Sequence, residues 1–247
     1  MTAASEVVVD FLGTGNFLAP GRYWNSFVLD ESILVEPSPT ALPNLRRCGL
    51  AVDSLDVIVV SHFHADHTFG WPFLLLEIIH RRESRPIFVV GPPGVEAFLV
   101  DMLVLGGVPN VLAEATEKLD LRFVEVDGST QEAGPLRFQA IEVEHVPHLR
   151  CFGYLFHLAG RVVGYSGDTR RCDGLDKLAE RSDVLILECN GPHAPGLPIT
   201  HMDVDAVREL RERHPSVPFV LTHLGADVDT SELRDVVVPD DFSRLTI

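Results

Sequence analysis

One stretch constrains the fold and the chemistry of this chain more than any other. Residues 61–67 read Ser-His-Phe-His-Ala-Asp-His, which places three imidazoles and a carboxylate within a few positions. They follow residues 57–60, a short, β-branched run without polar residues that predicts a fully buried strand. Imidazole and carboxylate are common ligands of divalent metals, and α/β proteins place their chemistry at the carboxyl ends of strands. A metal-ligand cluster therefore explains this motif better than scattered surface histidines do.

Further ionisable residues stand at the ends of other predicted strands. Residues 136–145 alternate apolar and polar side chains, and three later apolar runs also end in polar residues. The residues concerned are His145 in 136–145, Asp168 in 162–169, Glu188 in 184–188 and His223 in 219–223. Core packing does not easily account for such a residue at the end of one strand after another. The pattern indicates one shared site to which several strands contribute.

Strands and helices alternate along most of the chain, which is typical of an α/β fold. Helices are expected at 41–48, 73–80, 95–105 and 204–213. Residues 110–120 are polar and predict a loop or an irregular helix, and two halves rich in strands and helices meet near residue 120. A chain of 247 residues with this pattern is expected to form a single domain, residues 1–247.

Composition and charge exclude several classes of function. The formal net charge of −16 repels polyanions and disfavours broad nucleic-acid binding. The 4 cysteines are scattered and form no Cys-x-x-Cys pair, which fits a reducing compartment. Residues 1–6 lack the features of a secretory signal, and no apolar run is long enough to cross a bilayer. The sequence thus predicts a cytoplasmic protein without a membrane segment.

The His-x-His-x-Asp-His motif resembles that of the metallo-β-lactamase superfamily, and the resemblance extends from Leu12 to His223. The opening Leu-Gly-Thr-Gly at residues 12–15 is similar to that of the ribonuclease Z branch. The resemblance implies a four-layer αββα sandwich with a dinuclear site for two Zn²⁺, with Mn²⁺ and Fe²⁺ as alternatives. It also implies a metal-dependent hydrolase, because zinc acidifies water and stabilises developing negative charge.

The resemblance implies a set of metal ligands. One ion would take His62, His64 and His145, the other would take Asp66, His67 and His223, and Asp168 would bridge them. A bridging carboxylate suits two dications about 3.5–4 Å apart, because negative charge is needed between them. His148 is an alternative to His145, but the alternating strand pattern runs without a break into His145 and favours it.

Three residues are candidates for catalytic roles. Asp66 is expected both to bind a metal and to orient the attacking water. In ribonuclease Z-like enzymes, a glutamate at a strand end pairs with a histidine before the next helix and protonates the leaving oxygen, and Glu188 and His201 match these positions. A carboxylate beside an imidazole stabilises the imidazolium, as a general acid requires. The simpler interpretation is a buried carboxylate and a histidine that merely begins a helix.

The chain departs from the family pattern in two places. Residues 36–39 read Glu-Pro-Ser-Pro where many relatives carry an aspartate-rich turn, which we expect to affect packing near the site more than ligation. The long arm with which ribonuclease Z grips transfer RNA is missing, since only two strands and a turn fit between His145 and Asp168. Together with the acidic charge, this counts against transfer RNA as a partner. Loop residues proposed to determine specificity are Phe17, Trp24, Trp71 and Pro93.

The expected activity is hydrolysis of a small-molecule substrate, a small phosphodiester such as a cyclic nucleotide. An ester-type hydrolase (arylsulfatase, thioesterase or lactonase) is the alternative on the same site, because sulfate esters also need a protonated leaving group. A non-catalytic metal-binding scaffold is a third interpretation, although such domains usually lose ligands. Relatives often pair as dimers, so a homodimer is a further expectation.

Overall fold

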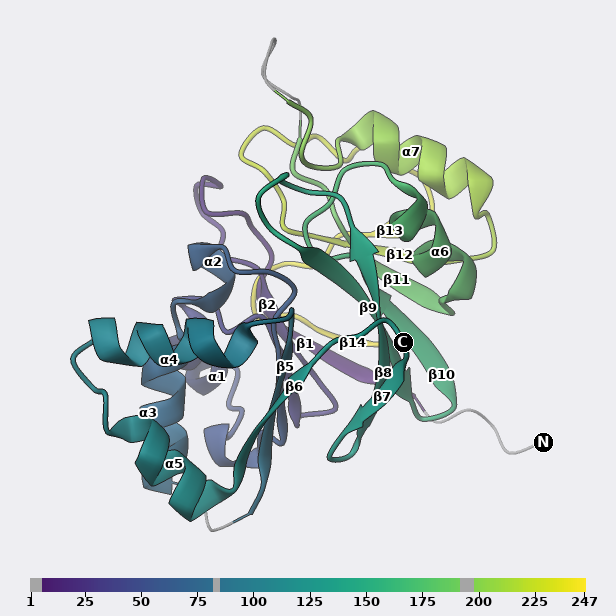
Figure 1. Ribbon diagram of the computed structural model, residues 1–247. Coiled ribbons are helices and arrows are strands. Elements are labelled where there is room, and N and C mark those ends of the chain that lie inside the picture. Colours follow the sequence, from purple (N-terminus) through teal and green to yellow (C-terminus); the bar gives the residue numbers. More distant parts are fainter. Residues whose placement is uncertain (1–5, 82–84, 192–197) are drawn as a thin grey trace.

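The computed structural model describes residues 6–81, 85–191 and 198–247, which form two seven-stranded sheets with helices outside them (Figure 1). The first sheet has the order β14 (Arg244–Thr246), β1 (Val8–Gly13), β2 (Ser26–Leu29), β3 (Ile33–Val35), β4 (Val57–Val59), β5 (Ile87–Gly91) and β6 (Leu121–Glu125). Its strands β3 to β6 run parallel, so their carboxyl ends gather at one edge. The last strand of the chain returns to pair with the first, which ties the C-terminal segment to this sheet.

The second sheet is built from the later part of the chain. Its order is β13 (Val236–Val237), β12 (Phe219–Thr222), β11 (Val184–Glu188), β10 (Arg161–Tyr165), β9 (Cys151–Leu158), β8 (Leu136–Val143) and β7 (Thr130–Ala133). Strands β10 to β13 run parallel, and β7 to β10 form an antiparallel meander. Parallel strands covered on both faces are apolar throughout, and β11 is indeed buried along its whole length.

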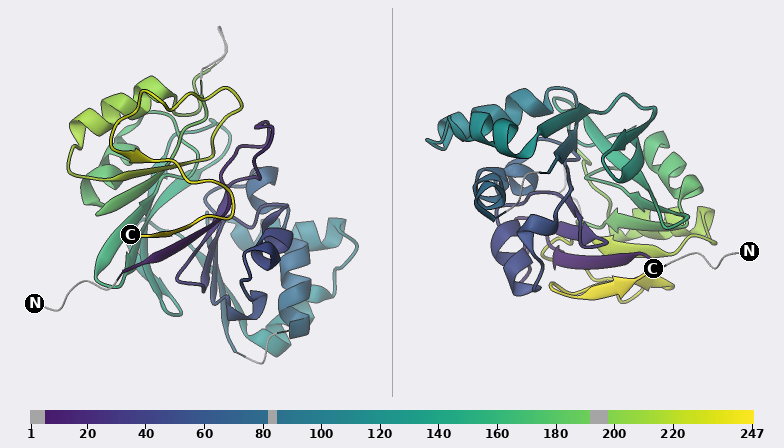
Figure 2. Two further views of the ribbon diagram at one scale, coloured as in Figure 1. Left: turned by 180° about the vertical axis from the view of Figure 1, so that it is seen from behind. Right: turned by 90° about the horizontal axis from the view of Figure 1, so that it is seen from below.

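Helices cover the outer faces of both sheets (Figure 2). They are α1 (Ala41–Arg47), α2 (Ala65–Thr68), α3 (Trp71–Arg81), α4 (Val95–Leu105), α5 (Val111–Leu119), α6 (Asp173–Arg181) and α7 (Val204–Arg213), with a 3₁₀ turn, η1, at Val52–Ser54. One apolar cluster joins α1, α3, α4 and α5 to the first sheet, and another joins α6 and α7 to the second. The layers are therefore helix, sheet, sheet and helix, which confirms the predicted αββα sandwich.

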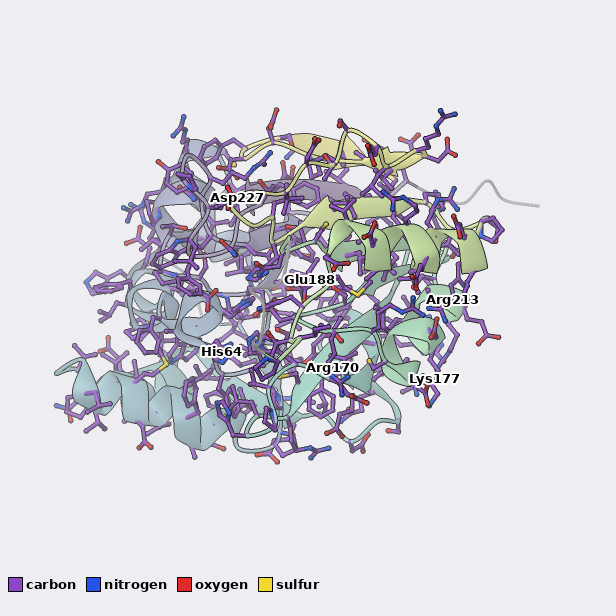
Figure 3. All side chains as sticks on the ribbon, turned by 90° about the horizontal axis from the view of Figure 1, so that it is seen from above. His64, Arg170, Lys177, Glu188, Arg213 and Asp227 are labelled. Atoms are coloured by element: carbon purple, nitrogen blue, oxygen red, sulfur yellow. The ribbon has the colours of Figure 1, made fainter. Side chains whose placement is uncertain are left out.

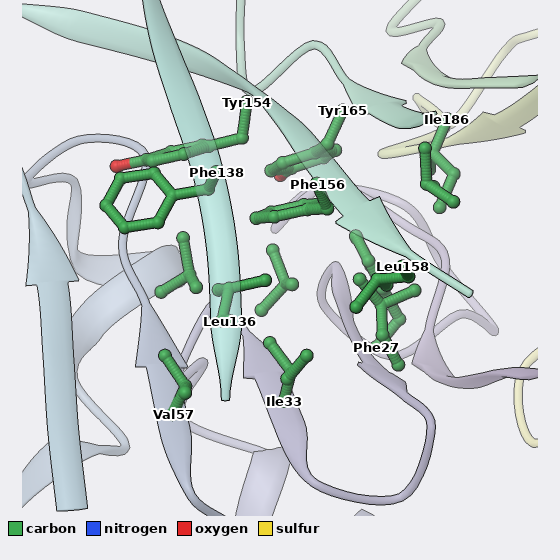
Figure 4. Close-up of a cluster of buried hydrophobic side chains, with 14 of the residues drawn as sticks. Phe27, Ile33, Val57, Leu136, Phe138, Tyr154, Phe156, Leu158, Tyr165 and Ile186 are labelled. Atoms are coloured by element: carbon green, nitrogen blue, oxygen red, sulfur yellow. The ribbon is translucent and has the colours of Figure 1, made fainter. Parts of the chain in front are cut away.

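The central layer of the core lies between the two sheets (Figure 4). The first sheet contributes residues such as Phe27 and Val57, and the second contributes Phe138 and Tyr154, all fully buried. Aromatic rings supply much of this contact area, and Phe27 meets Tyr165 edge to face at 5.1 Å between ring centroids. This packing fixes the two sheets relative to each other, so groups at their carboxyl ends are held in register.

The structure corrects several details of the sequence interpretation. Residues 110–120 contain the regular helix α5 instead of a loop or irregular helix, because Val111, Ala115 and Leu119 form a buried stripe at four-residue spacing. The strands preceding His145 and Asp168 end earlier than expected, at Val143 and Tyr165. Both ionisable residues thus lie in the loops that follow the strands.

Two further expectations can be compared with the structure. Cys48, Cys151, Cys172 and Cys189 all lie in the described ranges and are free thiols. Among the described helices, none combines the length and the apolar character needed to cross a membrane.

Candidate metal centre

The first sheet supplies the histidine motif from the loop after β4. His62 follows the strand closely and is fully buried, and His64 precedes the short helix α2, which contains Asp66 and His67. Residues 65–68 thus form a single helical turn within this connection. Gly70 follows this turn and approaches the backbone of Ser38 so closely that any side chain would collide with it. The motif is therefore packed against the turn that follows β3.

The second sheet supplies the other predicted residues from the ends of four strands. His145 lies two residues beyond β8, Asp168 three residues beyond β10, Glu188 at the end of β11 and His223 directly after β12. All four are buried, and His223 adopts a left-handed backbone conformation with φ of 49°. In Figure 3, His64 from the first half of the chain and Glu188 from the second lie where the two halves meet.

The structure brings these residues together in two groups of ligand atoms. The first ligand group is His62, His64, His145 and Asp168, and the second is Asp66, His67 and His223; within each group the ligand atoms lie within 4.8 Å of one another. His148 is exposed and belongs to neither group, whereas the Nε2 atom of His145 lies 3.2 Å from Nδ1 of His64. All seven predicted ligands are thus close enough to share one centre.

Asp168 belongs to the first ligand group and also faces the second. Its Oδ2 atom is 3.3 Å from Nε2 of His67, 3.5 Å from Nε2 of His223, 3.8 Å from Nε2 of His62 and 3.9 Å from Nε2 of His145. A single oxygen therefore faces two histidines of each group. This is the position that a carboxylate shared by two cations would take.

Several buried atoms of the centre lack partners within the described chain. Both ring nitrogens of His67, Nε2 of His223 and Oδ1 of Asp168 are buried without a hydrogen bond. Buried polar groups are normally paired, because leaving one unsatisfied costs about 1–3 kcal/mol. In the first ligand group, Nε2 of His62 and Nε2 of His145 both approach one nitrogen of His64. Cations bound by Nε2 of His67, Nε2 of His223 and the carboxylate of Asp168 would satisfy those atoms, so the donor set fits divalent metals.

Burial and charge shift the pKa values of the histidines in opposite directions in the two ligand groups. Burial lowers the pKa of all three histidines in the first ligand group, which favours the neutral form that binds metals. Burial also opposes protonation of His67 and His223, but the surrounding carboxylates, Asp168 foremost, together outweigh the effect of burial. The pKa of His67 lies well above its ordinary value, and that of His223 is raised to about 10. The acidic side of the centre therefore attracts positive charge.

Neighbouring groups orient the ligand histidines through their other ring nitrogens. Nδ1 of His62 lies 2.9 Å from Oγ of Ser61, and Nδ1 of His145 lies 2.8 Å from the carbonyl oxygen of Thr200. Such contacts fix the tautomer and the direction of a ligating imidazole. Both would leave Nε2 as the nitrogen that faces Asp168.

Glu188 and His201 form the predicted pair beside the two ligand groups. Nδ1 of His201 lies 3.0 Å from both carboxylate oxygens of Glu188, and Oε1 of Glu188 also accepts a hydrogen bond from the backbone N–H of Thr169 at 2.5 Å. Burial lowers the pKa of His201, but Glu188 together with Asp168 more than offsets this effect, so the pKa of His201 is raised. His201 also comes within 4.8 Å of Asp168 and His223, which makes it a potential metal ligand as well.

Two interpretations of the surroundings need correction. Trp71 is fully buried as the first residue of α3 and packs in the outer core, so it is not a loop residue that contacts substrate. Glu36 has a larger role near the site than we expected: it is fully buried, and its Oε2 atom lies 3.6 Å from Nδ1 of His67. In the sequence, the only sign of this role was the position of Glu36 at the end of a predicted strand. That position did not show where the side chain points.

Metal binding is expected to stabilise the fold. With free Zn²⁺ at about 1,000 times its dissociation constant, the free energy of unfolding should rise by about 4 kcal/mol per independent site, because the ligands meet only in the folded chain. Urea denaturation with zinc and with excess chelator measures the difference. The His67→Ala variant should show a smaller gain, and equal urea midpoints with zinc and chelator would contradict the metal assignment.

Comparisons with known proteins place this geometry in context. The family model described as "Beta-lactamase superfamily domain" matches residues 31–224. A ribonuclease Z from Clostridium perfringens is 29% identical over 166 residues, which cover 61% of this chain and 51% of that protein. The matched region thus spans about half the length of that relative, and the same holds for a ribonuclease Z from Lachnoclostridium phytofermentans.

Solved structures share the whole fold. The metallo-β-lactamase fold protein YhfI from Bacillus subtilis superposes with a TM-score of 0.78 at 18% identity, covering 98% of this chain and 100% of that one. The short form of human tRNase Z gives a TM-score of 0.75 at 22% identity, covering 96% and 98%. At these identities the similarity concerns the fold alone.

Proposed function

The chain belongs to the β-lactamase superfamily, in its ribonuclease Z-like branch, and on that premise we propose that it is a metal-dependent phosphodiesterase acting on a small phosphodiester. The observation that carries the proposal is the position of Asp168 Oδ2, which faces histidines of both ligand groups at 3.3–3.9 Å. Such a shared carboxylate supports a site for two cations, Zn²⁺ first, with Mn²⁺ and Fe²⁺ as alternatives.

The roles of the residues follow from the two ligand groups. His62, His64 and His145 would hold one cation, Asp66, His67 and His223 the other, and Asp168 both. When bound, the metals supply Lewis acidity that lowers the pKa of water and neutralises charge on the substrate. Asp66 would bind a metal and accept a hydrogen bond from the attacking water. Its Oδ2 atom lies 3.5 Å from Nε2 of His67 and 3.6 Å from Nε2 of His223, which supports this role.

The leaving group requires a proton, and in this proposal His201 gives it. Glu188 holds Nδ1 of His201, which leaves Nε2 as the nitrogen that can protonate an alkoxide. His201 is partly open to solvent, with 22% of its side chain exposed, so a substrate can reach it. No serine or cysteine nucleophile is needed: burial raises the pKa of Cys189, near Glu188, to about 12.

The surroundings of the centre support a small substrate. A cavity of about 650 Å³ is lined by His145, Thr200 and Arg170, and a neighbouring one of about 510 Å³ is lined by His201 and Arg170. These volumes suit a nucleotide-sized ligand. Between His145 and Asp168 the described chain forms a short loop, β9, a turn and β10, and this short segment supports a substrate smaller than transfer RNA.

Hydrolysis of model substrates tests the proposal. The zinc-loaded protein should hydrolyse bis(p-nitrophenyl) phosphate faster than p-nitrophenyl acetate or p-nitrophenyl sulfate, and the Asp66→Ala variant should lose this activity. Dominant ester or sulfate cleavage would instead indicate the ester-type hydrolase. Absence of turnover on all three by protein with both metals bound would favour a non-catalytic scaffold.

Three broader features belong to the same proposal. We propose that residues 1–247 act as one hydrolase domain, because both sheets contribute ligands to one centre. The cytoplasmic location and the homodimer expected from the sequence stay predictions.

A further inference from the structure

A chain of buried hydrogen bonds runs beneath the metal centre from one sheet to the other. Thr222, the residue before His223, donates from Oγ1 to Oδ1 of Asn25 at 2.6 Å, and Nδ2 of Asn25 donates to the hydroxyl of Tyr165 at 2.9 Å. The Tyr165 hydroxyl in turn donates to Oε1 of Glu36 at 3.1 Å. Each of these hydrogen bonds is donated in the direction of Glu36. The series therefore ends at the Glu36 carboxylate, which accepts the last hydrogen bond.

Glu36 is held firmly at the end of this chain. Its carboxylate also accepts from the backbone N–H of Ser61, at 3.3 Å to each oxygen, and the hydroxyl of Ser26 donates to its backbone carbonyl at 2.7 Å. Its backbone has φ of 61°, a left-handed conformation that is uncommon for glutamate and tends to occur at functional sites. The side chain is therefore directed at one place.

The carboxylate of Glu36 is directed at the imidazole of His67. Oε2 of Glu36 lies 3.6 Å from Nδ1 of His67, somewhat longer than a hydrogen bond, and Nδ1 has no other hydrogen-bond partner within the described chain. The opposite nitrogen, Nε2, faces Asp168 and Asp66. His67 thus has a carboxylate behind it and the proposed metal position in front.

We propose that Glu36 is a positioning residue that accepts the Nδ1 proton of His67 and so directs Nε2 to the second metal, with Thr222, Asn25 and Tyr165 holding Glu36 in place. This rests on the proposed function, because it presumes a cation at the second ligand group. A carboxylate behind a ligating histidine fixes its tautomer and increases its basicity, and loss of such a partner typically weakens metal binding 10- to 100-fold. In this proposal Glu36, directly after β3, belongs to the metal centre as the residue that orients a ligand.

Zinc titration against a chromophoric chelator tests this at the level of binding. The His64→Ala and His67→Ala variants first identify which of the two binding steps belongs to each ligand group. In Glu36→Gln, the dissociation constant of the His67 step should rise about 10- to 100-fold, while the His64 step changes much less. The matched control is Asp10→Asn, which removes another buried carboxylate, paired with Arg244 at 2.7 Å, without touching the centre.

A second variant keeps the inference testable if Glu36→Gln does not fold. Tyr165→Phe removes the side-chain hydroxyl that donates to Glu36 and should weaken the His67 step several-fold, with little effect on the His64 step. Wild-type values for the His67 step in the folded variants would overturn the inference, as would equal weakening of both steps or a wild-type protein that binds no metal at His67. If the wild type binds both metals without hydrolysing any substrate, the proposed function fails while the role of Glu36 stands.

Discussion

The Asp168→Ala variant is expected to lose hydrolytic activity by at least roughly a thousandfold, with little loss of fold. Among the described residues, Asp168 is the carboxylate whose Oδ2 faces histidines of both ligand groups, so its removal would leave two bound cations without the negative charge between them. A loss of about 4 kcal/mol in transition-state stabilisation corresponds to that factor. The measurements are kcat/KM on bis(p-nitrophenyl) phosphate and metal content after dialysis, which should fall below that of the wild type.

Two further variants separate charge from shape and from general damage. Asp168→Asn keeps the shape of the side chain but not its charge, and it should resemble Asp168→Ala if bridging is electrostatic. His148→Ala removes an exposed histidine close to the centre in sequence and should leave both activity and metal content unchanged. An Asp168→Ala protein with wild-type kcat/KM would remove Asp168 from the centre.

The sequence predicted which residues the structure brings together, because they are marked by position as well as by type. His62 follows a short apolar strand, and Glu188 ends another, so the strand boundaries alone place them at the same kind of edge. The carboxyl ends of parallel strands meet when two sheets pack face to face. Local pattern and global fold agree here, and this agreement brings His145 to within 3.2 Å of His64, 81 residues away.

Other features depend on tertiary packing, which the local sequence pattern does not show. Trp71 follows a glycine and precedes a proline, which suggests a loop. Its indole is nevertheless fully buried in the core between α3 and the first sheet. The role of Glu36 depends on a left-handed backbone and on Tyr165, far away in the sequence. The final strand, β14, pairs with β1 across nearly the whole chain, and no local pattern announces that register.

The second large effect is expected for His201→Ala, and it should depend on the leaving group. His201 is held by Glu188 at 3.0 Å, and its role as general acid matters only when the leaving oxygen is too basic to depart without a proton. With a poor leaving group, such as an alkyl alcohol, kcat should fall about 100- to 10,000-fold. With p-nitrophenolate, which is stable as an anion, the loss should be much smaller.

The comparison that checks this is the slope of log kcat against the pKa of the leaving alcohol across a series of phosphodiesters. The slope should be steeper in His201→Ala than in the wild type, and Glu188→Gln should steepen it in the same direction, since a neutral amide no longer stabilises the imidazolium. Because His201 also lies within 4.8 Å of Asp168 and His223, metal content must be measured beside the kinetics. Equal slowing of all substrates together with a lower metal content would identify His201 as a ligand instead of the acid. Equal slowing with full metal content would remove it from proton transfer altogether.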